Sequence, residues 1–324
     1  MFFKNPNSHR ENPFYSLYSS EKFRNVLKYR NDLPEFPPLV DVELTNFCNL
    51  NCLFCNQQVM TREKGFMRDD IFRKIVDECA EYGTPIRLIR FGEPFLHKKI
   101  IEYCRYAKDK GVKVHITNNG LIINEDHMRH IVELGVDSMI FSFQGATKDE
   151  YQKMRNNDKY DLLVSNIKRL VEIRGDSEKP FIQVSSTMTN ESKEEVDAFV
   201  SYWSGIVDAV SVGKTNLSSF SMDQVKSFEK IGKIEYLRTQ ETIEKKYVPC
   251  VEVYQKLSVD YDGKVTGCCG DHDRLLQVGD VNKESLHEIW NSSKLLKSYR
   301  TLLDNMRHSS LSLCRTCYHT YEDF

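Results

Sequence analysis

The sequence has no long apolar run, and this absence excludes a protein that crosses a membrane as a helix. No unbroken apolar stretch reaches the roughly 18 residues that such a helix needs. The opening residues, MFFKNPNSHRENPF, also lack the apolar core of a secretory signal peptide. We therefore expect a cytoplasmic protein without a membrane partner.

An excess of charge of either sign is also missing. The 45 Lys and Arg residues nearly balance the 47 Asp and Glu residues, so no overall field attracts nucleic acid. The 15 Gly and 9 Pro residues are too few for a collagen-like or low-complexity chain, and 40% hydrophobic residues suffice for an ordinary core. The length of 324 residues favours two domains, or one large α/β domain with an appendage.

Cysteine is what the sequence has in quantity. In a cytoplasmic protein thiols stay reduced, and clustered cysteines are then more often metal ligands than disulfide partners. The ten cysteines form a group of three, a doublet, a pair and three single positions, namely Cys48, Cys52 and Cys55; Cys268 and Cys269; Cys314 and Cys317; and Cys79, Cys104 and Cys250.

Strand-like and helix-like patterns alternate through the first two thirds of the chain. Helical patterns separate six strand-like runs, which are Leu39 to Leu44, Arg87 to Phe91, Lys113 to Thr117, Ser138 to Ser142, Phe181 to Thr187 and Ala209 to Gly213. Such alternation predicts parallel βαβ units and hence an α/β fold, a partial (β/α)6 TIM-like barrel. Residues with chemical roles should lie in the loops that follow the strands.

The same patterns predict four segments. Residues 1–37 are a polar and aromatic lead-in without a clean period, which could close one end of the barrel. Residues 38–213 form the barrel core, and residues 214–247 form a bridging helical segment. Residues 248–324 form a small second domain, in which the Asp262-Gly263 turn is a strong signal for a β-hairpin.

The segment CNLNCLFC places Cys48, Cys52 and Cys55 on one loop after the first strand. Three thiolates can hold three irons of a 4Fe-4S cube and leave the fourth iron open for another ligand. The alternative is a zinc knuckle, but zinc usually takes a fourth protein ligand, and no further Cys or His lies near this loop in the sequence.

ELTNFCNLNCLFC resembles the cluster loop of the radical S-adenosylmethionine (SAM) superfamily, Cys-x3-Cys-x-aromatic-Cys, with Phe54 in the aromatic position. RFGEPF places Gly92, Glu93 and Pro94 after the second strand, and it resembles the family segment that binds the methionine ammonium of SAM. The resemblance therefore implies that these four residues bind the cofactor.

Three further positions match the family in chain order. Asn118 lies in TNNG after the third strand, Ser142 begins SFQGAT after the fourth, and Arg155 ends a Y-x3-R pattern that starts at Tyr151. The resemblance implies SAM contacts for Asn118, Ser142 and Arg155, although turns and helix starts use the same residue types for structural reasons. The family often has Asp where this chain has Gln144, to which we assign no role.

The C-terminal cysteines are similar in arrangement to the SPASM domain, an extension of radical SAM enzymes that binds auxiliary clusters. Four thiols would complete one auxiliary 4Fe-4S cluster without an open iron, and these are Cys250, Cys268, Cys314 and Cys317. A structural zinc site with four cysteine ligands is the alternative. The spacing after Gly263 favours Cys268 over Cys269 as the ligand, but the choice within the doublet stays open.

The resemblance implies an enzyme that cleaves SAM reductively to a 5′-deoxyadenosyl radical and removes a hydrogen atom from a substrate. An electron donor such as flavodoxin or ferredoxin would reduce it. We expect a small substrate, a sugar, aminocyclitol or nucleoside, that is oxidised or epimerised, with Cys269 as a candidate hydrogen donor unless it merely packs. The alternatives are a peptide-modifying radical SAM enzyme and, from another class, a zinc-stabilised binding protein without turnover.

Overall fold

The computed structural model describes residues 1–189, 191–215 and 248–317, and the chain divides into two compact units. The first unit comprises Met1–Pro13, Cys48–Val59 and His115–Ile243, and the second comprises Phe14–Phe47, Met60–Val114 and Glu244–Phe324. The predicted bridging segment 214–247 lies outside the described residues from 216 onward. The division into the four predicted segments stays a prediction.

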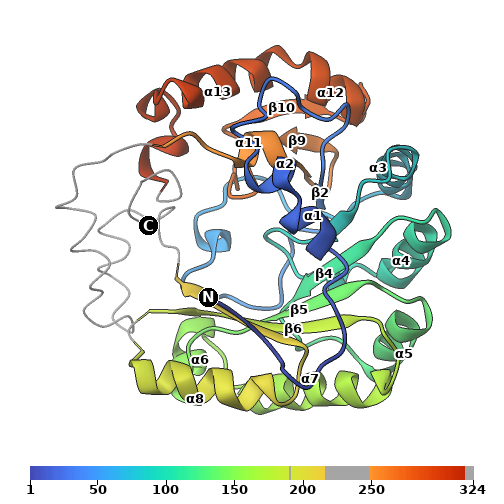
Figure 1. The fold of residues 1–324 in the computed structure, drawn as a ribbon, viewed down its shortest axis with the longest axis vertical. Helices are drawn as coiled ribbons and strands as arrows, with labels where there is room; N and C mark the ends of the chain where they lie inside the picture. The colour runs from blue at the N-terminus through green and yellow to red at the C-terminus, as the bar shows by residue number, and fades with distance from the viewer. Residues whose placement is uncertain (190, 216–247, 318–324) are drawn as a thin grey trace. The chain divides into compact units, whose positions relative to one another are not determined.

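The first unit is built on a mostly parallel sheet, in which the strand order is β1-β7-β6-β5-β4 (Figure 1). Its strands are β1 (Phe2–Lys4), β4 (Val114–Asn118), β5 (Ser138–Ser142), β6 (Phe181–Met188) and β7 (Ala209–Lys214). Strands β4 to β7 pair in parallel, as predicted. β1 pairs antiparallel with β7, so the lead-in contains a strand that its sequence did not reveal.

Within the described part of this unit the helices are α5 (Glu125–Glu133), α6 (Lys148–Arg155), α7 (Tyr160–Arg174) and α8 (Lys193–Ser204). α6 and α7 are separate helices, because Asn156 adopts φ 53° and ends α6. Capping boxes begin α5 at Asn124 and α8 at Ser192, where each side chain accepts a backbone hydrogen bond.

One face of this sheet carries the core of the first unit. Alternate strand residues such as Ile116, Phe141, Val184 and Val210 are fully buried. Phe143, which directly follows β5, packs on Phe199 and Trp203 of α8, with ring centroids 5.5 and 5.2 Å away. Apolar side chains therefore alternate along each strand with side chains that lie on the other face.

The second unit has a mixed sheet in the order β3-β2-β8-β9-β10. Its strands are β2 (Val40–Val42), β3 (Ile86–Leu88), β8 (Leu257–Val259), β9 (Lys264–Thr266) and β10 (Gln277–Asp280). β2 pairs in parallel with both β3 and β8, so the C-terminal region continues a sheet begun by predicted barrel strands. β8 and β9 form the predicted hairpin, with Gly263 at φ 89° in its turn.

The helices of the second unit are α1 (Tyr15–Ser19), α2 (Glu21–Arg24), α3 (Asp69–Glu81), α4 (Ile100–Asp109), α11 (Glu252–Gln255), α12 (Leu286–Ser292) and α13 (Lys294–Asp304). Short 3-10 turns lie at η2 (Pro94–Leu96), η3 (His308–Ser310) and η4 (Cys314–Thr316), and η1 (Asn56–Gln58) belongs to the first unit. Among the described residues, no helix combines the length and apolar character needed to cross a membrane. The alternating strands and helices confirm the α/β fold, and neither described sheet closes on itself.

Residues 1–13 of the lead-in belong to the first unit, where the buried carboxylate of Asp208, which precedes β7, holds them. Asp208 accepts hydrogen bonds from Arg174, from the Ile182 amide at 2.7 Å and from the Ser8 hydroxyl at 2.7 Å. The Arg174 and Asp208 side chains are only 3% and 2% exposed. Their charges are therefore compensated inside the protein rather than by water.

Replacing Asp208 by asparagine should destabilise the protein by about 3–5 kcal/mol, because the buried Arg174 guanidinium then lacks its counter-charge. The matched control is Asp197→Asn, which breaks an exposed i,i+4 pair with Lys193 and should cost less than about 0.5 kcal/mol. Urea unfolding of both variants measures the difference. Equal midpoints for the two variants would show that the Asp208 pair is not a stabilising contact.

Candidate functional site

The three clustered cysteines lie on a loop of the first unit that the end of α6 supports. The Leu53 amide donates a hydrogen bond to the Met154 carbonyl at 2.9 Å, and the Cys55 amide donates to the Cys52 carbonyl at 3.2 Å. Cys52 is 5% exposed, whereas Cys48 and Cys55 are half-buried. The loop thus presents three thiols from a short, tightly turned segment.

Two side chains direct N–H groups at the sulfurs. Arg155 Nη1 approaches Cys52 Sγ at 3.6 Å, while its Nη2 donates to the carbonyls of Ser142 at 2.7 Å and Phe143 at 3.2 Å. Asn119 Nδ2 lies 3.9 Å from Cys48 Sγ. Such donors stabilise anionic thiolates and tune a cluster bound to them.

Tyr151 and Arg155 of the Y-x3-R pattern lie one turn apart on α6 and both face the cysteine loop. Burial raises the pKa of Tyr151, and the charge of Cys52 adds to that shift. The Arg155 guanidinium also lies over the Phe54 ring, 5.4 Å from its centre. The aromatic position of the cysteine motif therefore supports the cation that contacts Cys52.

The two remaining predicted residues of this unit have different surroundings. Ser142 ends β5 and is half-buried, with its carbonyl bonded to Arg155. Asn118 pairs in register with the core residue Phe141, and its side chain donates to the Ile140 carbonyl at 3.1 Å. The neighbouring Asn119, which we did not single out, is the amide that contacts Cys48.

Gly92, Glu93 and Pro94 lie in the second unit, immediately after β3. A Cβ on Gly92 would lie 1.9 Å from the Thr45 carbonyl oxygen, so only glycine fits this backbone contact. The Glu93 amide donates to the Phe47 carbonyl at 2.8 Å, and Glu93 Oε1 accepts from the Phe95 amide at 3.1 Å. The Glu93 carboxylate is thereby held in place while 2% exposed.

Arg90 joins this segment to the loop of the cysteine doublet. Its side chain is fully buried and donates to the Asp271 carbonyl at 2.8 Å and to the Cys268 carbonyl at 3.4 Å. Its backbone adopts φ 128°, which a non-glycine residue rarely does. Strain of this kind is kept only where surrounding contacts enforce it, and such sites are often functional.

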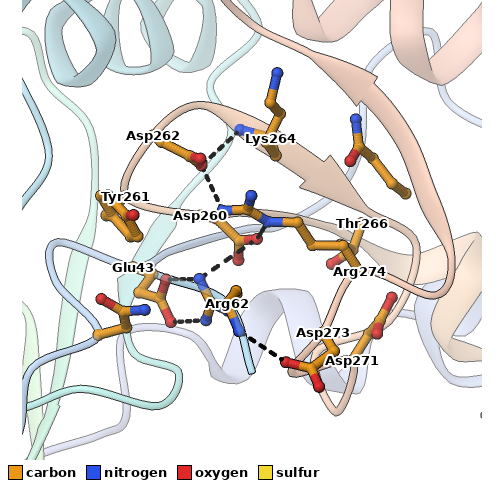
Figure 2. Close-up of polar contacts among 12 residues, drawn as sticks. Glu43, Arg62, Asp260, Tyr261, Asp262, Lys264, Thr266, Asp271, Asp273 and Arg274 are labelled. Carbon is orange, nitrogen blue, oxygen red and sulfur yellow. Dashed lines mark hydrogen bonds and ion pairs between the residues drawn. The ribbon is translucent and has the colours of Figure 1, made fainter. Parts of the chain in front are cut away.

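An ionic network surrounds the turn of the β8–β9 hairpin (Figure 2). Both Nη atoms of Arg62 donate to the Glu43 carboxylate at 2.6 Å. Arg274 donates to Asp260 at 2.7 Å and to Asp262 at 2.6 Å. Burial raises the pKa of Asp260 against the opposing effect of its arginine neighbours. The network ties the end of β2 to the hairpin within the second unit.

The C-terminal thiols gather in the second unit. Burial raises the pKa of Cys250 and of Cys314 to about 12 each. The charge of Cys317 adds to both shifts, and the charge of Cys250 adds to that of Cys314. A polycationic iron-sulfur core would relieve the repulsion between such thiolates.

The cysteine doublet presents its two thiols to different neighbours. A hydrogen bond with Cys269 and burial raise the pKa of Cys268, and the charge of Cys250 contributes. Cys269 Sγ instead donates to Glu252 Oε2 at 3.2 Å. Cys268 as the cluster ligand of the doublet stays a prediction.

The donor chemistry at both sites fits iron-sulfur clusters. Each set consists of thiols, and Arg155 and Asn119 supply N–H groups toward the first set. Within the described ranges, no three His, Cys, Asp or Glu side chains converge as ligands of one metal ion do.

Asn119 and Arg90 are the polar residues that the sequence analysis missed. Asn119 lies beside Asn118 in the TNNG segment and directly follows β4. The two neighbouring side chains have different partners, because successive residues of an extended chain point in opposite directions. Arg90 directly precedes FGEP, but nothing in the local sequence marks its positive φ or its distant carbonyl partners.

Comparison with protein families accounts for both cysteine sets. The pattern of the radical SAM superfamily matches residues 42–202, and the pattern of SPASM, an iron-sulfur cluster-binding domain, matches residues 250–318. The first range contains the loop cysteines and the second contains the five C-terminal ones.

The sequence similarity to individual proteins is low and covers part of the chain. The tungsten-containing aldehyde ferredoxin oxidoreductase cofactor-modifying protein of Pyrococcus furiosus is 30% identical over 200 residues, which are 60% of this chain. The match spans 55% of that relative, about half its length.

Two solved structures share the fold. SuiB of Streptococcus suis bound to its precursor peptide SuiA has a TM-score of 0.66 at 17% identity, covering 95% of this chain and 76% of SuiB. BtrN in complex with AdoMet and 2-DOIA has a TM-score of 0.55 at 15% identity, covering 89% of this chain and 96% of BtrN. The likeness confirms the predicted partial TIM-like barrel with its C-terminal iron-sulfur domain.

Replacing Arg155 by methionine should lower the reduction potential of a cluster on the loop cysteines, because the reduced cluster loses a nearby positive charge. Hydrogen bonds to charged groups contribute about 1.5–3 kcal/mol, and 1.4 kcal/mol corresponds to about 59 mV for one electron, so we expect a shift of about 60 mV or more. An EPR-monitored titration without SAM, in a Cys314→Ala/Cys317→Ala background, measures it.

The matched control for this titration is Lys153→Met, which removes a half-exposed cation from the same helix. Arg155→Lys should recover part of the shift because it restores the charge. If the Arg155→Met and Lys153→Met proteins have the same potential, Arg155 does not act on the cluster.

Proposed function

Since the chain belongs to the radical SAM superfamily and carries a C-terminal SPASM domain, we propose that this enzyme oxidises or epimerises a small polar substrate. The observation that carries the proposal is the cysteine loop with N–H groups directed at its sulfurs. When bound, a 4Fe-4S cluster and SAM supply a 5′-deoxyadenosyl radical that can remove a hydrogen atom from an unactivated C–H bond.

The protein's own residues divide into ligands and positioning groups. Three thiols, those of Cys48, Cys52 and Cys55, would hold the SAM-binding cluster. Arg155 holds Cys52 and the end of β5 together, and Phe54 supports its guanidinium. Asn118 and Ser142 are proposed as further cofactor contacts, on the strength of the resemblance.

Glu93 is the proposed acceptor for the SAM ammonium. Its carboxylate is buried, and the Phe95 amide orients one of its oxygens. Gly92 lets the backbone approach Thr45, and Pro94 begins η2, so the carboxylate is part of a rigid segment. A fixed, desolvated carboxylate binds an ammonium more strongly than a mobile, exposed one.

The thiols of Cys250, Cys268, Cys314 and Cys317 are the proposed ligands of one auxiliary 4Fe-4S cluster. Four ligands leave no open iron for substrate. In an oxidation the substrate radical would lose a proton and pass one electron to this cluster. A ferredoxin or flavodoxin is the proposed donor of the electron that starts each turnover.

The compared structures hold both small substrates and peptides. BtrN is bound to 2-DOIA, and the alignment covers 96% of BtrN. SuiB and anSMEcpe are bound to peptides, and the alignments cover 76% and 92% of these chains. Peptide modification is therefore kept as the second candidate.

Label transfer tests the proposed function. Reconstituted protein with dithionite and SAM should transfer deuterium into 5′-deoxyadenosine from a member of a panel of deuterated sugars, aminocyclitols and nucleosides, measured by mass spectrometry. It should contain about eight irons, and Cys48→Ala/Cys52→Ala/Cys55→Ala about four, with no 5′-deoxyadenosine. Transfer only from deuterated peptides would favour the second candidate, and stoichiometric zinc without iron would exclude both.

The role of Cys269 decides between oxidation and epimerisation. A thiol donor would place one solvent deuterium on the product in deuterium oxide, and Cys269→Ala should then lose that product yet still form 5′-deoxyadenosine. The contact with Glu252 would assist reprotonation of the thiol. An oxidised product without solvent deuterium would instead assign electron transfer to the auxiliary cluster.

Replacing Glu93 by glutamine should weaken SAM binding about ten- to a hundredfold, because the charge-assisted hydrogen bond to the ammonium becomes a neutral one. Glutamine can still accept a hydrogen bond from the Phe95 amide, so the segment should keep its structure and both clusters should assemble. Equilibrium titration with SAM measures the affinity, and Glu102→Gln in α4 is the control substitution. Unchanged affinity in Glu93→Gln would remove Glu93 from the SAM site.

A further inference from the structure

The segment that leads from β3 to Glu93 is hydrogen-bonded to the doublet loop, residues 268–276, which carries the cysteine doublet. Arg90 Nη2 donates to the Asp271 carbonyl at 2.8 Å, and Nη1 donates to the Cys268 carbonyl at 3.4 Å. The segment and the loop both belong to the second unit. One side chain therefore connects the proposed site of the SAM ammonium with a proposed ligand of the auxiliary cluster.

The Arg90 guanidinium is fixed by all of its surroundings. Its side chain is fully buried, and Asp260 Oδ1 lies 3.1 Å from Nη2. Nη1 also donates to the Thr266 hydroxyl at 3.2 Å. Figure 2 labels three of these partners, Asp260, Thr266 and Asp271. A buried guanidinium that left these acceptors would leave its N–H groups unpaired, so Arg90 moves only together with them.

The backbone of Arg90 has a conformation that its side-chain contacts must hold. Its φ is 128°, which glycine adopts readily and arginine rarely. Strain of this kind persists only where surrounding contacts enforce it, and it relaxes when they are removed. Rotation about this φ changes the direction in which the chain continues to Gly92 and Glu93. The position of the Glu93 carboxylate therefore depends on contacts made with the doublet loop.

The Phe91 ring adds an apolar contact beside the hydrogen bonds. It lies 5.2 Å from the Arg90 guanidinium and edge-on to the His272 ring, with 6.2 Å between the ring centroids. Arg90 thus supports the ring that packs on the doublet loop. Two adjacent residues of the segment contact the loop, and both contacts involve the same guanidinium or a ring packed on it.

The doublet loop presents its carbonyls from a defined turn. The Asp271 carboxylate is fully buried and accepts the amides of Leu275 at 2.9 Å and Leu276 at 2.7 Å. The Asp271 amide donates to the Cys268 carbonyl at 3.3 Å, and the Gly270 amide donates to Cys268 Sγ at 3.4 Å. The thiol of Cys268 and the carbonyls that bind the arginine thus belong to one turn. A cluster held by this thiol would fix that turn.

We propose that Arg90 is a positioning residue that couples the two cofactor sites, so that a cluster on the C-terminal thiols strengthens SAM binding at Glu93. The proposal rests on the proposed function and adds a form of regulation to its site. Arg90 keeps its strained backbone only while the doublet loop holds the guanidinium, so loss of the auxiliary cluster weakens SAM binding. Coupling of this kind is reciprocal, and bound SAM in turn stabilises the doublet loop.

The coupling suits an enzyme that passes an electron to its auxiliary cluster. Protein without this proposed acceptor would bind less SAM and would therefore form fewer radicals that cannot be used. The chemical step itself is not altered by Arg90, which acts through the position of Glu93.

SAM titration without a reductant measures the coupling, because SAM is then not cleaved. The four proteins are the wild type, Arg90→Lys, Cys314→Ala/Cys317→Ala without the auxiliary cluster, and the combination of both changes. Removing the auxiliary cluster should weaken SAM binding about fivefold or more in the wild type, but less than about twofold in Arg90→Lys. Lysine keeps the positive charge beside Asp260 but lacks the fork that reaches both carbonyls.

The matched control is Arg274→Lys. Arg274 also pairs with Asp260, at 2.7 Å, but its other partner is Asp262 in the hairpin turn. This variant should keep the wild-type dependence of SAM affinity on the auxiliary cluster. Iron analysis accompanies each titration, and Arg90→Lys and Arg274→Lys should both hold about eight irons.

Hydrogen exchange followed by mass spectrometry gives a second measurement. SAM should slow exchange in a peptide that covers residues 268–276 of the wild type, and it should not do so in Arg90→Lys. Removing the auxiliary cluster should speed exchange at the amides of Glu93 and Phe95, which are hydrogen-bonded in the intact segment. This last comparison uses no Arg90 variant, so it tests the proposal even where Arg90→Lys does not assemble its clusters.

Two results would overturn the coupling and leave the proposed function intact. The first is a SAM affinity, or an exchange rate at Glu93 and Phe95, that is the same with and without the auxiliary cluster. The second is an equal effect of cluster removal in the wild type and in Arg90→Lys, as expected if Arg90 only stabilises the fold. Protein that holds zinc in place of iron, or that does not bind SAM, would overturn the proposed function and the coupling with it.

Discussion

Three arginines converge on the buried carboxylate of Asp260. Arg90 lies 3.1 Å from Asp260 Oδ1, while Arg274 and Arg62 lie 2.7 and 3.6 Å from its Oδ2. The carboxylate is fully buried, and Glu43 and Asp262 are further counter-charges for Arg62 and Arg274. In the second unit, Asp260 thereby connects the ends of β2 and β3, the doublet loop and the hairpin turn.

A buried arginine also lies at the cysteine loop of the first unit. Arg155 is 7% exposed and is held by two carbonyls at the end of β5 before it reaches Cys52. A buried guanidinium with several fixed acceptors cannot move without leaving donors unpaired. In both units, therefore, a buried arginine links a strand end to a loop that carries cysteines. The fixed hydrogen bonds of that arginine help to hold the loop in position.

Sequence patterns were informative wherever the determinants are local. The predicted strands match the structure to within a few residues, because apolar periodicity acts over short distances. Three-residue β1 is too short to show a period, and its pairing with β7 spans more than 200 residues. The spacing of the cysteines indicated clusters, but the approach of Arg155 to Cys52 depends on how α6 packs.

Along strands β4 to β7, residues that pack in the core alternate with residues on the opposite face of the sheet. Alternate positions hold the core, whereas the positions between them carry hydroxyl and amide groups such as Gln183, Ser185 and Ser211 together with Ile140 and Phe181. A substitution at Ser185 or Ser211 changes the polar surface without altering core volume, while one at Val184 does the reverse. Ligand preference in such a sheet can diverge between related proteins without loss of stability, because mutations that alter recognition and mutations that alter folding fall on different residues.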